Sequence, residues 1–266
     1  MGEIQHETGL PVIGHLPLLT RTQAMFKPNA KSADGLPSAL FAIQRPNSPE
    51  AEACRSIRTS LLYSAQTPGG KIVQGTSPDV NDGKTLVSLN LAAIMAMPGK
   101  RTLLIDANFR NPMLHQIFNI PDSMTLVDAI DLPADQWTSK LTKGPIDNFW
   151  LLPAGVAQRN PAELLSSNRF EEFLNQARQE FDFVIMDSPS ILSVTDSTIL
   201  AQRADGVVMT MRFTRDGRPR AIQATELLNK VEANLLGTVV NAVGPVALQR
   251  SANSSMSVNV PVLGDR

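Results

Sequence analysis

Short apolar runs alternate with longer amphipathic stretches along most of the chain after residue 70. The runs are largely continuous instead of alternating between apolar and polar positions, which is typical of strands covered on both faces. This pattern predicts strands at Lys71–Gly75, Arg101–Asp106, Phe149–Pro153, Phe183–Asp187, Gly206–Arg212 and Leu236–Asn241.

Helical spacing of apolar residues marks the intervening stretches. In EACRSIRTSLLYS, Ile57, Leu61 and Leu62 recur at helical spacing, so a helix is expected from about Glu52. Because strands and helices alternate, we expect an α/β fold with a single doubly wound, mostly parallel sheet and helices on both faces. The further predicted helices are Gly83–Met97, Leu126–Ile130, Pro161–Glu180, Asp196–Gln202 and Pro219–Ala233.

The two ends of the chain differ in composition from the middle. Residues 1–50 are rich in Pro, Gly, Ser and Asn, which predicts an irregular N-terminal arm. Residues 51–245 carry the alternating pattern and are expected to form the one folded domain, followed by a polar tail at 246–266. Ligands of such folds bind at the carboxyl ends of the strands.

The composition limits the cellular compartment and the class of partner, and it does not favour a charged partner. The 266 residues have a formal net charge of −1, so no charge excess favours nucleic acid or an acidic membrane surface. The one cysteine, Cys54, excludes an internal disulfide and fits a small buried residue in a reducing compartment. No apolar run reaches the roughly 18 residues of a spanning helix, and no secretory signal is seen. We therefore expect a cytoplasmic protein that reaches a membrane only through a partner.

The stretch SPDVNDGKT lies between a predicted strand and a predicted helix. Gly83, Lys84 and Thr85 fit the end of the phosphate-binding pattern G-x-x-x-x-G-K-[ST], whereas Pro78 stands at its first glycine. Lysine binds outer phosphates, the hydroxyl binds Mg²⁺, and the helix N-terminus attracts anions. Residues 79–82 replace a glycine-rich bend with side chains that restrict the backbone, and two of them are carboxylates that repel phosphate unless they point outward. The loop alone leaves open whether it binds nucleotide or nothing.

Two acids follow predicted strands. In LLIDANFRNP, Asp106 ends a strand and Asn108 lies two residues on, where an extended backbone points both side chains the same way. Asp106 has the chemistry to hold Mg²⁺ or accept a proton from a nucleophile, whereas Asn108 cannot act as a base. In FDFVIMDSPS, an apolar strand delivers Asp187 to its tip, the form of an acid that orients water around Mg²⁺. Each acid also fits an ordinary strand-end residue.

In order, these segments resemble the bacterial tyrosine kinases of capsule and exopolysaccharide synthesis, in the Mrp/MinD-like branch of P-loop ATPases. The resemblance runs from about Glu52 to about Val243. SPDVNDGKT matches the Walker A position, LLIDANFRNPMLHQIF the Walker A′ segment, LLPAGVAQRNPAELLSS a further family stretch, and VIMDSPS with VTDSTILAQRADGVV the Walker B region. EACRSIR matches the family's Glu-x-x-Arg-x-x-Arg element, which implies subunit packing in a ring through Glu52, Arg55 and Arg58.

The resemblance also implies a cofactor and a set of site residues. The cofactor is ATP or ADP with Mg²⁺, and the partner is a membrane chain-length or co-polymerase protein. The implied roles are catalytic for Asp106 and Lys84, nucleotide-binding for Gly83, Lys84, Thr85 and Asn241, and metal-binding for Thr85, Asp106 and Asp187.

The chain departs from the family pattern at several positions. Asn108 replaces the second Walker A′ acid, Asn81 a loop glycine and Ser190 a proline after Walker B. The family phosphorylates a C-terminal tyrosine cluster, but this sequence has one tyrosine, Tyr63, near its N-terminal helix. Autophosphorylation of a tail cluster is therefore excluded, and Tyr63 and His115 are expected to be packing residues.

We therefore expect a cytoplasmic, kinase-like P-loop protein of polysaccharide synthesis or export. Nucleotide is expected to act as a conformational switch, with weak or no tyrosine autokinase activity. One alternative is a pseudokinase scaffold that binds no nucleotide. A less favoured alternative is a MinD- or ParA-like positioning ATPase, because Asp79 stands where those proteins have a lysine.

Overall fold

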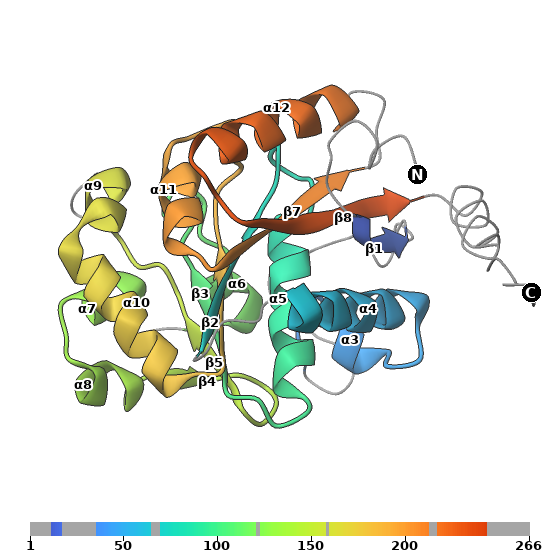
Figure 1. The fold of residues 1–266 in the computed structure, drawn as a ribbon. Coiled ribbons are helices and arrows are strands. Elements are labelled where there is room, and N and C mark those ends of the chain that lie inside the picture. The colour runs from blue at the N-terminus through green and yellow to red at the C-terminus, as the bar shows by residue number, and fades with distance from the viewer. Residues whose placement is uncertain are drawn as a thin grey trace, which may run out of the picture.

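The computed structural model describes residues 12–17, 36–64, 70–120, 123–157, 160–212 and 217–243. Within these ranges the chain forms one eight-stranded sheet with helices on both faces (Figure 1). The sheet order is β1-β8-β7-β2-β6-β3-β5-β4, and the pairings are parallel except that of β4 with β5. The strands are β1 Val12–Pro17, β2 Lys71–Thr76, β3 Thr102–Asp106, β4 Thr142–Lys143, β5 Phe149–Leu152, β6 Phe183–Asp187, β7 Gly206–Arg212 and β8 Leu235–Val243.

The predicted α/β fold is confirmed, and each predicted strand is present to within two residues of its expected ends. The strands β1 and β4 were not predicted. β4 is only two residues long, too short for a period to be visible in the sequence. The helices are α3 Phe41–Gln44, α4 Pro49–Ser64, α5 Lys84–Ala96, α6 Leu114–Phe118, α7 Leu126–Ile130, α8 Ala134–Thr138, α9 Pro161–Ser166, α10 Asn168–Glu180, α11 Asp196–Arg203 and α12 Gly217–Lys230.

One predicted helix is two helices. The expected helix Pro161–Glu180 is interrupted at Ser167, whose backbone is extended with φ −70° and ψ 153°. The Ser167 hydroxyl accepts a hydrogen bond of 3.2 Å from the Phe170 N–H, so it caps the second helix, α10. Serine favours this position because its side chain replaces a backbone acceptor that the first helical turn lacks.

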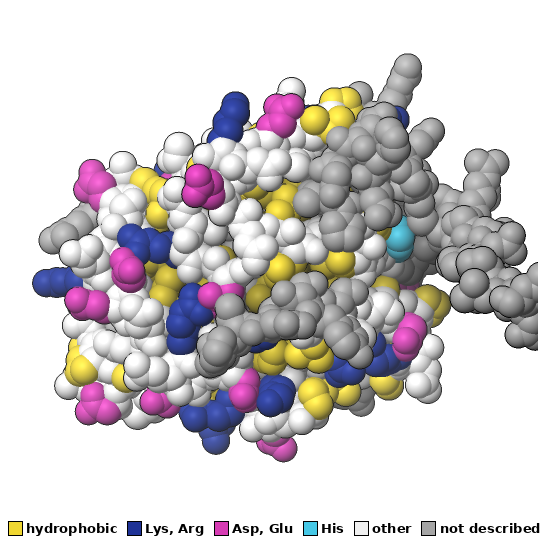
Figure 2. Space-filling view, viewed as in Figure 1, with side chains coloured by type: hydrophobic (Ala, Val, Ile, Leu, Met, Phe, Trp, Pro, Cys, Tyr) yellow, Lys and Arg dark blue, Asp and Glu magenta, His cyan; other side chains and the backbone are white. Residues whose placement is uncertain are grey.

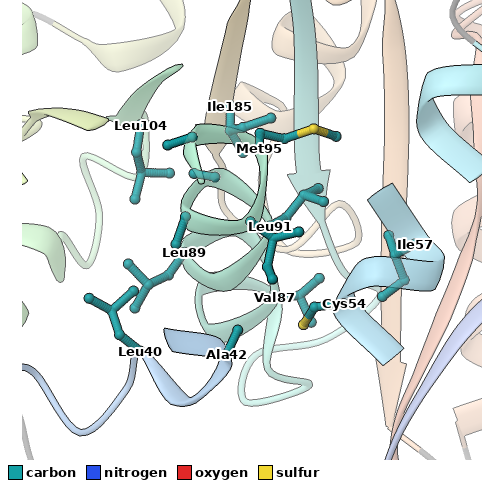
Figure 3. Packing of buried hydrophobic residues seen from close by; sticks show 14 of the residues in the cluster. Leu40, Ala42, Cys54, Ile57, Val87, Leu89, Leu91, Met95, Leu104 and Ile185 are labelled. Carbon is teal, nitrogen blue, oxygen red and sulfur yellow. The ribbon is translucent and has the colours of Figure 1, made fainter. Parts of the chain in front are cut away.

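Successive residues of the central strands point to opposite faces of the sheet and pack into two apolar cores. Val73, Leu104 and Ile185 face the layer of α3, α4 and α5, where they join one apolar cluster. Their chain neighbours Ile72, Leu103 and Val184 face the layer of α7 to α11 and join a second cluster. Figure 3 shows the first core, in which Leu89 and Leu91 of α5 lie between the sheet and the N-terminal helices. α5 is buried on nearly all sides, so it holds its own first turn in a fixed position relative to the sheet.

The N-terminal residues contribute to this core. Composition predicts an irregular arm over residues 1–50, yet β1 pairs in parallel with β8 and α3 packs on α5. Phe41 and Ala42 are buried, and Gly14 lies so close to α4 that a Cβ there would be 2.3 Å from Cγ1 of Ile57. The described parts of this region are therefore built into the domain. The predicted tail at 246–266 lies outside the described residues.

Among the described residues, the face drawn in Figure 2 carries no single dominant charge. Figure 2 shows basic and acidic side chains interspersed over one face of the molecule, in keeping with the near-zero net charge. Among the helices that the structure describes, none is both long and apolar enough to cross a membrane.

Candidate functional site

Three neighbouring strands bring the predicted motifs to one edge of the sheet. β2, β6 and β3 are adjacent and parallel, so their carboxyl ends meet. Asp187 is in register with Gly75 on one side and with Asp106 on the other. The loop after β2 and the two acids are therefore assembled as the sequence predicts.

The loop reaches its bend without the usual glycines. Asn81 has φ 66° and Gly83 has φ 98°, both in the left-handed region. Asparagine is one of the side chains that tolerate this region, so Asn81 does locally what a glycine does elsewhere. Gly83 then caps α5, which begins at Lys84. The side chains at residues 79–82 are thus compatible with a tight turn into the helix N-terminus.

The two loop carboxylates are engaged by other groups. Asp79 forms an ion pair with Arg220 of α12. Oδ2 of Asp82 accepts a hydrogen bond of 3.0 Å from the Asp79 N–H. Burial raises the pKa of the Asp82 carboxyl, while this hydrogen bond and the nearby Arg212 act in the opposite direction. Because both carboxylates have partners, the repulsion that the sequence predicts is reduced.

The Asp187 carboxylate accepts hydrogen bonds from two side chains of α5. Its Oδ2 accepts a hydrogen bond of 2.7 Å from the Thr85 hydroxyl, and its Oδ1 one of 3.4 Å from the Ser88 hydroxyl. Burial raises the pKa of Asp187 to about 7, against the positive charge of Lys84 and with the negative charge of Asp106. The carboxyl is 1% exposed, so a cation that replaced its proton would gain strongly from the low dielectric.

Both carboxylate oxygens of Asp106 accept hydrogen bonds from backbone N–H groups. Its Oδ1 accepts from the Asn108 N–H at 3.1 Å, and its Oδ2 accepts from the Met113 and Leu114 N–H groups at 2.8 and 3.0 Å. Burial raises the pKa of this carboxyl, and these three hydrogen bonds and His115 lower it. Asp106 therefore anchors the loop between β3 and α6, whatever else it does.

An ion pair between half-exposed Arg110 and buried Asp196, which the sequence did not reveal, holds the same loop. Nε and Nη2 of Arg110 donate to the two carboxylate oxygens of Asp196 at 3.0 and 3.3 Å. Asp196 is fully buried and begins α11, where the helix N-terminus also stabilises its charge. Both residues lie in segments that the resemblance covers, but nothing in their spacing pairs them. Asn108 accepts a hydrogen bond of 3.2 Å from the Asn111 N–H within this loop.

A buried network of polar side chains supports the end of β2. Nε2 of Gln74 donates to the Ser188 and Ser197 hydroxyls at 2.8 and 2.9 Å. Thr76 joins the Ser197 hydroxyl at 2.9 Å and donates to the Pro189 carbonyl. The network connects β2, the segment after Asp187, and α11. The only sign of it in the sequence is the presence of polar residues within the apolar strand β2.

Other predicted residues lie elsewhere or make different contacts. Glu52 and Arg55 form an exposed ion pair of 2.6 Å within α4, and Nη1 of Arg58 lies 3.4 Å from the Ile94 carbonyl. Nδ2 of Asn241 donates to the Asp82 carbonyl at 2.8 Å, so it reaches the loop. Tyr63 lies in α4, and its side chain is outside the described part of the structure.

The assembled residues fit a nucleotide with Mg²⁺. Thr85 and Asp187 offer hard oxygen ligands side by side, Lys84 adds a positive charge, and the N-terminus of α5 faces the loop. Within the described residues, no group of three or more His, Cys, Asp or Glu side chains is placed to hold a metal alone.

Comparison with known proteins gives the family. A family model described as "AAA domain" matches residues 81–235. The chain is 34% identical over 245 residues to the putative tyrosine-protein kinase EpsB of Ralstonia nicotianae, a match that covers 91% of this chain and 32% of EpsB. It is 33% identical over 202 residues to the tyrosine-protein kinase YwqD of Bacillus subtilis, covering 76% of this chain and 85% of YwqD.

The solved structures agree with this placement. The crystal structure of the chimerical protein CapA2B2 matches with a TM-score of 0.76 and 25% sequence identity, covering 91% of this chain and 99% of that one. The chain spans about a third of the length of EpsB, so the match concerns one part of that longer protein. With the P-loop geometry in place, the comparisons show that the chain belongs to the bacterial tyrosine-protein kinase family of P-loop ATPases.

Proposed function

We propose that this chain binds ATP and ADP with Mg²⁺ and serves exopolysaccharide or capsule synthesis as a kinase-like, nucleotide-dependent regulator. The observation that carries the proposal is the Thr85 hydroxyl held on Asp187 beside Lys84, at the start of α5. The named relatives are tyrosine-protein kinases, which supports phosphoryl-transfer ancestry. Asp187 joins the loop from a separate strand, an arrangement typical of working phosphate loops.

Each site residue has a proposed part. Lys84 binds the outer phosphates, and Thr85 and Asp187 hold the Mg²⁺, which neutralises phosphate charge when bound. Asp187 must lose its proton to accept the cation. Asp106 holds the neighbouring loop and has one carboxylate oxygen, Oδ1, with a single backbone donor, so a catalytic role for it rests on that oxygen. Asn241 is proposed to lie near the nucleotide because its amide contacts the loop.

We further propose that tyrosine autophosphorylation is weak or absent. Tyr63 is the one tyrosine of these 266 residues, so a cluster of acceptors is not available within them. Nucleotide would then act mainly on assembly, through a ring that uses Glu52, Arg55 and Arg58 and docks on a membrane co-polymerase protein. The Glu52–Arg55 pair lies on the surface of α4, so both side chains are accessible to a second copy.

Calorimetric titration with MgATP and MgADP tests the nucleotide site directly. Wild type is expected to bind both, and Lys84→Met to lose binding, because the lysine charge is removed from the phosphates. Lys100→Met is the matched control, since Lys100 is an exposed lysine just after the far end of α5. Strong tyrosine transfer that Lys84→Met abolishes would contradict the proposal of weak kinase activity.

A scaffold that binds no nucleotide is the second candidate. The observation in its favour is that the Asp79 N–H donates to the Asp82 carboxylate, so this loop N–H already has an acceptor within the protein. Absence of binding heat, together with an unchanged melting temperature at high MgATP, would favour the scaffold. Binding to the native state alone raises stability by about 2.7 kcal/mol at a hundredfold excess over Kd.

A further inference from the structure

The phosphate loop is held from outside by one unit late in the chain, β7–α12–β8. Arg220 in the first turn of α12 pairs with the Asp79 carboxylate. Asn241 of β8 donates from Nδ2 to the Asp82 carbonyl at 2.8 Å. Arg212, at the end of β7, lies near the Asp82 carboxylate. The contacts with Asp79 and Asp82 span 141 and 159 residues of sequence, so they are tertiary rather than local.

Contacts within the loop complete the fixation of Asp79. The Ser77 hydroxyl donates to the Asp79 carbonyl at 2.6 Å, and the Asp79 N–H donates to Asp82 at 3.0 Å. With Arg220 on its carboxylate, Asp79 is held at its backbone N–H, its carbonyl and its side chain. A residue held at all of these points retains little freedom in the native state.

Asn241 also packs against the loop sterically. A Cβ built on Gly83 would lie 2.1 Å from Nδ2 of Asn241. Gly83 is therefore needed for close approach as well as for its φ of 98°. Movement of Gly83 towards β8 would therefore meet the Asn241 amide.

We propose that Asp79, Asp82, Arg220 and Asn241 form a brace that presets the phosphate loop, with Arg220 and Asn241 as positioning residues for the nucleotide. The inference rests on the proposed nucleotide binding and adds how this chain achieves it. A loop with few glycines gains affinity when its bound shape exists beforehand, because less ordering is required on binding. Arg220 also neutralises Asp79, whose unpaired charge would repel phosphate.

A double-mutant cycle on the Asp79–Arg220 pair tests the charge part. Kd for MgADP is measured by calorimetry in Arg220→Gln, Asp79→Asn and the double variant. Arg220→Gln is expected to weaken binding by about fivefold, because it leaves Asp79 unpaired beside the phosphates. The double variant is expected to return to within about twofold of wild type, since no unpaired carboxylate remains. Lys230→Gln, at the exposed far end of α12, is the control and should leave Kd unchanged.

The double variant separates neutralisation of Asp79 from other roles of Arg220. If it binds as weakly as Arg220→Gln, then Arg220 does not act by neutralising Asp79, and the charge part of the brace is overturned. An effect of Arg220→Gln below twofold, with tight wild-type binding, overturns it as well.

Hydrogen exchange of the nucleotide-free protein tests the brace without any nucleotide. Asn241→Ala removes the donor to Asp82, so amides of residues 79–83 are expected to exchange at least about tenfold faster than in wild type. Unchanged exchange there would overturn the brace. Faster exchange in a protein whose wild type binds no nucleotide would support the brace while rejecting the proposed function, so the two failures are distinguishable.

Discussion

The Thr85 hydroxyl donates a 2.7 Å hydrogen bond to Oδ2 of Asp187, across 102 residues of sequence. One residue is in the first turn of α5 and the other ends β6. The bond sets two oxygen groups side by side, which is the arrangement that a shared Mg²⁺ requires. It also offsets part of the cost of burying the Asp187 carboxyl, since a hydrogen bond to a buried acid replaces one lost from water.

Thr85→Val is expected to lower the free energy of unfolding by about 1–2 kcal/mol and to abolish Mg²⁺-dependent nucleotide binding. Valine has the shape of threonine but leaves Oδ2 of Asp187 without this donor and offers the metal no ligand. Urea denaturation gives the stability, and titration with MgADP gives the affinity. Thr85→Ser is the matched control because it keeps the hydroxyl. Wild-type MgADP affinity in Thr85→Val would contradict the metal assignment.

The raised pKa of Asp187 predicts a characteristic dependence of stability on pH. Its folded pKa is about 7, whereas an aspartate in an unfolded chain titrates near 3.9. Because the folded value is raised, the contribution of this group to stability is fully present below about pH 4 and is lost as the pH rises through about 7. Lys84 and Asp106 face the same carboxyl and move its titration in opposite directions.

Asp187→Asn isolates that contribution, because asparagine cannot ionise. Relative to wild type, the variant is expected to gain a few kcal/mol of unfolding free energy as the pH rises from about 4 to about 7. Urea denaturation of both proteins at several pH values provides the comparison. A stability difference that does not change over this range would show that Asp187 is ionised throughout and that its pKa is not raised.

The sequence predicted the sheet and the meeting of the motifs because both follow from local patterns. Apolar runs identify strands, and parallel strands place their carboxyl ends at one edge, so Asp106 and Asp187 were expected at the same edge. The folded sheet adds that their strands are adjacent. The bend at Asn81 was less accessible. Asn81 has a left-handed φ, which asparagine tolerates but does not require. A glycine at this position would have been a clearer signal of the bend.

Tertiary partners explain most of what the sequence did not predict. β1 and α3 lie in a region whose composition favours irregular structure, and they are ordered by β8 and α5, far along the chain. The Arg110–Asp196 and Arg220–Asp79 pairs are equally non-local. Charged residues occur throughout the sequence, so only the folded backbone selects which of them meet.

Asp106→Ala is expected to be strongly destabilising, by about 4 kcal/mol. The substitution leaves the buried N–H groups of Asn108, Met113 and Leu114 without their acceptor, at a cost of about 1–3 kcal/mol each before relaxation. Asp106→Asn keeps an acceptor oxygen and should lose less. Asp147→Ala, at an exposed turn, is the control. A loss below about 1 kcal/mol in Asp106→Ala, by urea denaturation, would refute the anchoring role.

Asn90 of α5 joins the N-terminal segment to the core. Its Oδ1 accepts from the Ala42 N–H at 3.0 Å, and its Nδ2 donates to the Ala39 and Leu86 carbonyls at 2.8 Å each. Asn90→Leu is expected to lower the free energy of unfolding by about 3 kcal/mol, because the buried groups of Ala39 and Ala42 lose their partners. Exchange of the Ala42 amide should accelerate before global unfolding.

Urea denaturation and hydrogen exchange together decide whether this connection holds the segment in place. Asn175→Leu, on the exposed face of α10, is the matched control and should change stability by less than about 0.5 kcal/mol. Loss of stability without faster exchange at Ala42 would mean that Asn90 supports α5 alone. Faster exchange confined to residues 36–44 would show that these residues dock as a unit through Asn90, because β2 and the rest of α5 remain protected by their own hydrogen bonds.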